Sequence, residues 1–93
     1  MKDTAKTWAD GLTAYKQRNY GEAAEIWTVL ASQGDAEAQF NLGVMYKDGI
    51  GVPQNNVDAI LWLRKSSDQG HEHARLIVDM INRESGDDLQ DDA

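Results

Sequence analysis

Two histidines, His71 and His73, are the only imidazoles in the chain, and they lie two residues apart. At that spacing on a helix their side chains point to different faces, so they do not form a metal-binding pair. We expect both to lie in solvent near the start of a helix. Cysteine is absent, which excludes disulfide bonds, thiolate catalysis and cysteine-based zinc sites. The sixteen acidic residues form no recognisable catalytic set, so we predict no enzyme activity and no cofactor.

The segment 42–56, LGVMYKDGIGVPQNN, is the other place where chemistry could occur. It lacks the GxGxxG pattern, follows a helical rather than a strand pattern, and is not followed by Lys-Ser or Lys-Thr. It therefore fits neither dinucleotide binding nor a phosphate-binding P-loop. Gly49 and Gly51 permit positive φ, Pro53 fixes its own φ, and Val52 can pack beneath the turn. We interpret the segment as a structural turn, with a binding contact as the weaker alternative.

The charge and polarity of the chain exclude several classes of partner. Its formal net charge is −7 over 93 residues, so we expect neither nucleic acid nor an anionic membrane surface as a partner. Residues 85–93 contain four aspartates and no base, and we predict that they form a disordered acidic tail. No apolar run approaches the roughly 18 residues of a membrane span, so we predict no membrane insertion.

The first ten residues are polar and contain no signal-peptide core. We therefore expect a cytoplasmic protein. A periplasmic or secreted location remains the alternative if a signal peptide has been removed.

Apolar residues recur at three- and four-residue intervals along the chain, and alternating β-branched runs do not occur. This pattern predicts an all-α protein. The expected helices cover about residues 4–18, 20–33, 36–47, the segment from Asn55 or Asn56 to just before Gly70, and 72–84.

Capping residues mark the expected ends of these helices. Asn19 is expected to cap the second helix, with Glu22 as its capping-box partner. Asp35 is expected to cap the third helix. Gly34 is expected to end the second helix in the left-handed conformation, and Gly70 the fourth.

Short motifs recur in the chain at a nearly constant spacing. The segment Ala24–Trp27 is repeated 35 residues later as Ala59–Trp62, and Gly11 is matched by Gly43 after 32 residues. The difference of three residues is an insertion in the second copy, and the glycine-proline loop is that insertion. A repeat of this length with two helices in each copy predicts an α-solenoid. We expect one domain over 1–84, with repeat one at about 5–34, repeat two at about 35–70 and a capping helix at about 71–84.

The repeated glycines lie inside predicted helices, where glycine costs about 0.5–1 kcal/mol relative to alanine. We expect that cost to be offset by close packing of the paired helix. Trp62 or Ala59 should lie against Gly43, and Trp27 against Gly11.

Residues 38–70 resemble a known family, the Sel-one-like repeat of the tetratricopeptide-like α-solenoid superfamily. The residues that match its motif are Ala38, Leu42, Gly43, Tyr46, Gly49, Gly51, Val52, Ala59, Trp62 and Gly70. Ser66 and Ser67 depart from it, because the motif favours alanine there. Residues 5–37 resemble a tetratricopeptide helix pair more closely. The resemblance implies a right-handed α–α superhelix of two helix pairs and a capping helix, in a protein, often bacterial, that acts as an adaptor for other proteins.

Counting from Gly11 and Gly43 predicts which residues line the concave side of such a solenoid. The nine predicted groove residues are Trp8, Leu12, Tyr15, Phe40, Val44, Lys47, Leu76, Met80 and Arg83. An apolar stripe with a basic rim favours binding of another protein or a peptide. Two alternatives stay open: the stripe is simply core, or the chain forms a homodimer or larger oligomer through this groove or its last helix.

Overall fold

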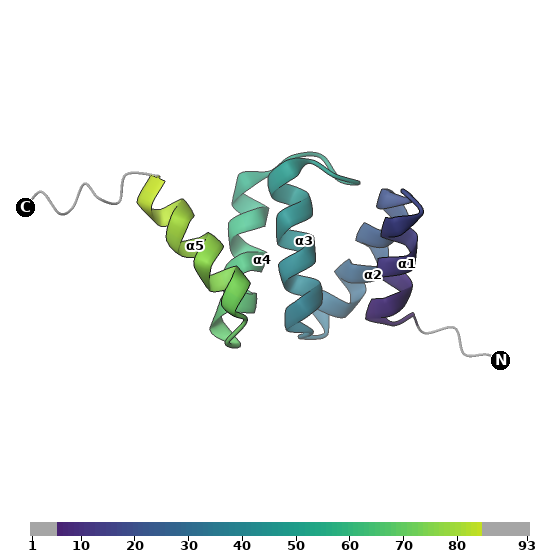
Figure 1. The fold of residues 1–93 in the computed structure, drawn as a ribbon, viewed down its shortest axis with the longest axis horizontal. Helices are drawn as coiled ribbons and strands as arrows, with labels where there is room; N and C mark the ends of the chain where they lie inside the picture. Colours follow the sequence, from purple (N-terminus) through teal and green to yellow (C-terminus); the bar gives the residue numbers. More distant parts are fainter. Residues whose placement is uncertain (1–5, 85–93) are drawn as a thin grey trace, which may run out of the picture.

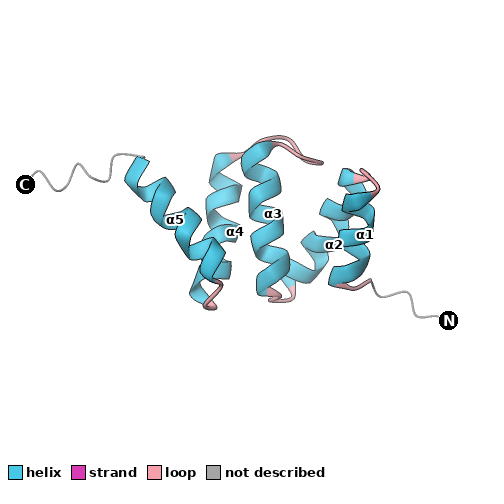
Figure 2. Ribbon diagram, in the orientation of Figure 1, coloured by secondary structure: helices cyan, strands magenta, loops and turns pink. Residues whose placement is uncertain are grey.

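A computed structural model describes residues 6–84, so the predicted acidic tail, 85–93, lies outside the described residues. The described part contains helices and no strand (Figure 2). The helices are α1 (Trp8–Lys16), α2 (Tyr20–Ser32), α3 (Ala36–Asp48), α4 (Asn56–Asp68) and α5 (Glu72–Glu84). The prediction of a five-helix all-α protein is confirmed.

The helices form a row in which each one packs mainly on its neighbours in the chain (Figure 1). α1 lies at one end of the row and α5 at the other. The molecule measures 60 × 24 × 17 Å, which is the elongated shape of a solenoid rather than of a closed bundle.

The first helix is shorter than predicted, because its ends are set by residues whose roles the apolar periodicity does not reveal. Thr7 is the N-cap: its hydroxyl accepts a hydrogen bond from the Asp10 amide at 3.3 Å, and its own amide donates to the Asp10 carboxylate at 2.8 Å. This capping box starts the helix at Trp8. Arg18 has a φ of 66°, which no helical residue adopts, so the predicted extension of the helix to Arg18 was wrong.

The predicted capping box of the second helix is also wrong. Asn19 makes no side-chain capping bond with α2. Its backbone amide instead donates to the carbonyl of Ala14 at 2.8 Å, closing a tight turn between α1 and α2. The other cap predictions are confirmed: Asp35 accepts from the amides of Glu37 and Ala38 at 2.9 and 3.1 Å. Of the two candidates for α4, Asn55 is the cap and accepts from the amide of Asp58 at 3.0 Å.

Glycine lets the helices of each pair approach closely. A Cβ placed on Gly11 would lie 2.7 Å from Cε2 of Trp27, so the predicted contact is confirmed. A Cβ on Gly43 would lie 2.7 Å from Cγ of Leu63 and 3.2 Å from the carbonyl oxygen of Ala59. The second glycine therefore packs on Ala59 as expected, but Leu63 rather than a tryptophan covers it.

The main hydrophobic core lies between α1, α2 and α3. Its buried residues are Ala14, Ala23, Ala24, Ile26, Trp27, Ala31, Ala38, Leu42 and Met45. Alanine is frequent in this set, which is consistent with closely spaced helices and a thin core.

The loop between α3 and α4 adopts the conformation expected of a structural turn. Gly49 and Gly51 have φ values of 70° and 75°. A Cβ on Gly51 would lie 2.5 Å from the carbonyl oxygen of Tyr20, so the loop reaches across to the first turn of α2 (Figure 1). Val52 is half-buried and packs against the core. The insertion thus ties the second helix pair to the first.

At the ends of α3 and α4 opposite this loop, polar side chains join α4 to α3 and to the turn before α3. Ser66 is fully buried, and its hydroxyl donates to the carbonyl of Ala36 at 2.8 Å. The Gln69 amide donates to the carbonyl of Gly34 and to the Gln39 side chain, both at 2.9 Å. Ser66 therefore supplies a hydrogen bond between α4 and α3 that an alanine at this position lacks.

Candidate protein-binding groove

A hollow with a volume of about 370 Å³ opens between α1 and α3, and we call it the α1–α3 pocket. Its lining residues are Trp8, Leu12 and Tyr15 from α1, Trp27 from α2, and Glu37, Phe40, Asn41, Val44 and Met45 from α3. Five of the nine predicted groove residues therefore lie around one opening. Those five are Trp8, Leu12, Tyr15, Phe40 and Val44, and each is half-buried. Trp8, Leu12 and Tyr15 also pack against the core.

Closely packed aromatic rings, tilted against one another, form the floor of the α1–α3 pocket. Trp27 is almost completely buried, and the ring centroids of Trp8 and Tyr15 each lie 5.9 Å from its own. The Trp27 indole nitrogen donates to the carbonyl of Trp8 at 3.3 Å. These contacts, which are typical of favourable aromatic pairs, hold Trp8 and Tyr15 in place before any ligand arrives.

Phe40 lies at the rim of the pocket and is held by a histidine from the start of α5. The rings of Phe40 and His71 are stacked, with centroids 4.5 Å apart and an interplanar angle of 19°. His71 Nδ1 accepts from the amide of Ala74 at 3.1 Å, so His71 acts as the N-cap of α5. Its Nε2 lies 3.0 Å from Oε1 of Glu37 and therefore donates to that carboxylate. One imidazole thus connects α5 to two pocket-lining residues of α3.

The expectation that both histidines lie in solvent was wrong for His71, whose side chain is only 11% exposed. The helical-face argument did not apply to it, because it precedes the first residue of α5. His73 is exposed, and the two ring centroids are 6.0 Å apart. Within residues 6–84, no cluster of three or more histidine, cysteine or acidic residues could hold a metal ion.

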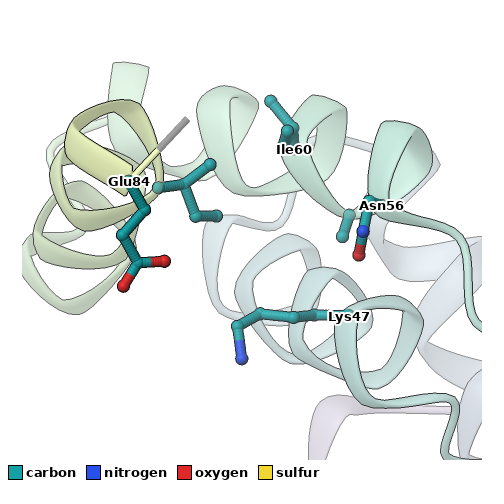
Figure 3. A pocket seen from close by; sticks show the side chains of 6 residues that line it. Lys47, Asn56, Ile60 and Glu84 are labelled. Atoms are coloured by element: carbon teal, nitrogen blue, oxygen red, sulfur yellow. The ribbon is translucent and has the colours of Figure 1, made fainter. Parts of the chain in front are cut away.

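A second hollow, also of about 370 Å³, lies between α3, α4 and α5, and we call it the α3–α5 pocket. It is lined by Lys47, Asn56, Ala59, Ile60, Ile81 and Glu84. Figure 3 shows the Lys47 amine and the Glu84 carboxylate reaching toward the same opening from α3 and α5. Lys47 also lies 3.4 Å from Asp48 in an exposed pair. The sixth predicted groove residue, Lys47, therefore belongs to a neighbouring pocket that carries both signs of charge.

The last three predicted groove residues lie on α5 and line neither pocket. Leu76 and Met80 are 55% and 51% exposed, and Arg83 is exposed. Two of their three equivalents on α3, Phe40 and Val44, line the hollow opposite α1, whereas among the described residues α5 packs mainly against α4. Within residues 6–84, the stripe on α5 therefore has no second wall.

Four residues of the α1–α3 pocket were not predicted: Trp27, Glu37, Asn41 and Met45. Glu37 and Asn41 follow from helical spacing, since Glu37 is three residues before Phe40 and Asn41 is three residues before Val44. They were missed because only the positions three residues before, one after and four after each glycine were counted. Trp27 was assigned to packing against Gly11, and it does that as well.

No helix among residues 6–84 has both the length and the apolar character needed to cross a membrane.

Comparisons with known proteins agree on one type of repeat. Residues 36–71 match the model of the Sel1 repeat family. The chain is 46% identical over 46 residues to the putative sel1-like repeat-containing protein L18 of Acanthamoeba polyphaga mimivirus, covering 50% of this chain and 8% of that protein. It is 35% identical over 54 residues to the rat DAP3-binding cell death enhancer 1, covering 58% of this chain and 11% of that protein. The chain thus spans about a tenth of the length of these curated relatives.

The fold is also similar to a solved structure. A Sel1 repeat protein from Oxalobacter formigenes superposes with a TM-score of 0.69 at 24% identity, covering 85% of this chain and 47% of the other. At that level of identity the likeness concerns the fold alone.

Proposed function

We propose, from the premise that this chain is a Sel1-like repeat protein of the tetratricopeptide-like superfamily, that it is a non-enzymatic adaptor or regulator. Its task is to bind another protein or a peptide along the concave side of its helix pairs. Sel1 repeats are generally protein–protein interaction modules and non-enzymatic scaffolds.

The observation that carries the proposal is the gathering of half-buried apolar side chains from α1 and α3 around one hollow. Trp8 and Tyr15 face this hollow from one wall, and Phe40 and Val44 from the other. Concave sites lined by aromatic residues with a few polar groups are where proteins most often bind ligands. Aromatic residues that are already held in place lose little freedom on binding and dominate interface energies.

The name of one relative supports a protein partner. The rat protein is named as a DAP3-binding protein, and its matching segment is a tenth of its length. For this chain we propose the same class of ligand, another protein.

A matched pair of variants tests the groove. Val44 lines the α1–α3 pocket, whereas Val29 is 56% exposed on α2 and lines neither pocket. We expect Val44→Ser to weaken capture of a partner from a lysate of the source organism at least severalfold, and Val29→Ser to leave it unchanged, as quantified by mass spectrometry. Circular dichroism melting of both variants checks that the fold persists. Equal capture by both variants contradicts binding in this groove.

Self-association is the second candidate, and the exposure of Leu76 and Met80 on α5 favours it. Two large apolar side chains one helical turn apart form a small patch that a second copy of the chain could cover. Light scattering after size exclusion, over a range of concentrations, measures this directly. A dimer that becomes monomeric on combined Leu76→Ser and Met80→Ser substitution supports assembly through the last helix, and a monomer at all concentrations contradicts it.

A further inference from the structure

We infer that the α1–α3 pocket receives a basic side chain, lysine or arginine, from the bound protein or peptide. The alkyl stem lies along the aromatic wall and the charged head lies at Glu37. This inference rests on the proposed function, because it specifies the ligand of the same groove.

Glu37 is the only charged residue among those that line the pocket. Its side chain is 50% exposed, so a ligand can reach the carboxylate from solvent. The net charge of −7 adds a long-range attraction for basic partners. The carboxylate of Glu37 and the net charge of the chain therefore both favour a positively charged ligand.

The rest of the lining suits the stem of a long basic side chain. Lysine and arginine bury their methylene groups on apolar surface while their heads stay near water. Trp8, Tyr15 and Phe40 offer ring surfaces around the opening. A cation within about 6 Å of such a ring gains a further attraction. A purely apolar ligand would instead cover part of the Glu37 carboxylate without replacing its water.

The Glu37 carboxylate is partly fixed before a ligand binds. His71 donates to Oε1 at 3.0 Å, and the imidazole is held in turn by the Ala74 amide and by stacking on Phe40. Oε2 remains as the acceptor for an incoming head group. Because the acceptor is pre-positioned beside Phe40, binding a cation there requires less loss of side-chain freedom.

The neighbouring α3–α5 pocket does not support the same inference. It carries Lys47 on one side and Glu84 on the other, so its charges favour no single sign of ligand. An acidic side chain in the α1–α3 pocket would face a like charge at Glu37. The arrangement therefore selects against acidic ligands as well as for basic ones.

The test is a selection of random dodecapeptides displayed on phage against the full chain. We expect lysine or arginine to be enriched in the peptides that lose binding to Val44→Ser. For one such peptide, fluorescence anisotropy should give a Kd about three- to tenfold weaker with Glu37→Gln. Replacing the peptide's basic residue by glutamine should give a similar loss, and the two changes together little more than either alone. Glutamine keeps a side-chain oxygen for the His71 hydrogen bond, so the fold should persist.

Glu25→Gln is the matched control, since Glu25 is an exposed residue of α2 that lines neither pocket. It should leave the Kd unchanged at physiological salt. Peptides that depend on Val44 but show no basic enrichment, or bind Glu37→Gln as tightly as the parent chain, overturn the inference and leave the proposed function standing. Recovery of no peptide, or only of peptides indifferent to Val44→Ser, overturns both.

Discussion

Trp27 lies directly against the bare backbone of Gly11, so that any side chain at position 11 would overlap the indole ring. The ring is only 2% exposed, packs at a tilt against the rings of Trp8 and Tyr15, and donates a hydrogen bond to the carbonyl of Trp8. It cannot move aside without disturbing the floor of the α1–α3 pocket. The close approach of α1 and α2 therefore determines the shape of the proposed binding site.

We expect Gly11→Ala to destabilise the protein by about 1–2 kcal/mol. Overpacking a core costs about 1–3 kcal/mol, and alanine recovers about 0.5–1 kcal/mol of helix propensity. For a domain of this size the loss corresponds to a Tm lower by roughly 5–15 °C. Thermal unfolding followed by circular dichroism measures it.

Gly21→Ala is the matched control for this prediction. Gly21 lies in the first turn of α2, and a Cβ placed there meets no atom within 4 Å. The variant should be as stable as the parent chain or up to about 1 kcal/mol more stable. Similar destabilisation of both variants would show that the indole contact is not the cause.

Much of the fold could be predicted because its helix ends carry recognisable residues. Asp35 and Asn55 are strong N-caps, and Gly34 and Gly70 have φ values of 100° and 90°, so α2, α3, α4 and α5 were placed to within one or two residues. The first helix was placed poorly because no glycine ends it. Arg18 takes the left-handed conformation there, and a residue other than glycine gives little signal of this.

The candidate site was only partly predictable, for a geometric reason. Repeat arithmetic from Gly11 and Gly43 gives equivalent faces on α1 and α3, and these two helices do share a pocket. The same arithmetic cannot show that a last helix lacks a second wall, as at Leu76. The 36-residue offset from the N-cap Asp35 does lead to His71, which caps α5. Histidine, however, is not among the strong capping residues, so this role was not recognised.

The buried hydroxyl of Ser66 leads to a second prediction. It donates to the carbonyl of Ala36 at 2.8 Å, whereas its neighbour Ser67 is only half-buried and no comparable bond to another helix is seen for it in the described part of the chain. Both substitutions to alanine gain the same helix propensity, so their difference isolates the hydrogen bond. We expect Ser66→Ala to be less stable than Ser67→Ala by about 1 kcal/mol in urea unfolding. Equal stability would mean that this hydrogen bond makes no net contribution.

The capping box of α1 predicts a dependence of stability on pH. The hydrogen bond from the Thr7 backbone amide, helped by the Thr7 hydroxyl and Lys6, lowers the pKa of Asp10 below its ordinary value of 3.8. A carboxyl group with a lower pKa in the folded state stabilises the fold above its unfolded pKa. That contribution is lost as the pH falls below about 3.8 and through the folded pKa.

NMR titration of the Asp10 carboxyl carbon measures this shift directly. In Thr7→Pro, which removes both the backbone amide and the hydroxyl, the pKa of Asp10 should return toward its ordinary value. In Thr7→Ala, which removes only the hydroxyl, most of the lowering should remain, because the backbone amide is its main cause. An Asp10 pKa that is the same in all three proteins contradicts the capping box as the source of the shift.

His71 provides the last prediction, because it connects α5 to the proposed binding site. His71→Ala removes the N-cap of α5, the donor to Glu37 and the ring stacked on Phe40. Loss of a helix cap alone costs about 0.5–2 kcal/mol, so we expect faster hydrogen exchange throughout α5 and a lower Tm. His73→Ala is the matched control: His73 is exposed, and its replacement should leave exchange in α5 nearly unchanged.

Because Phe40 and Glu37 lose the same support, His71→Ala should also weaken the binding of any ligand to the α1–α3 pocket. A variant with intact binding but a frayed α5 would show that the two are not connected.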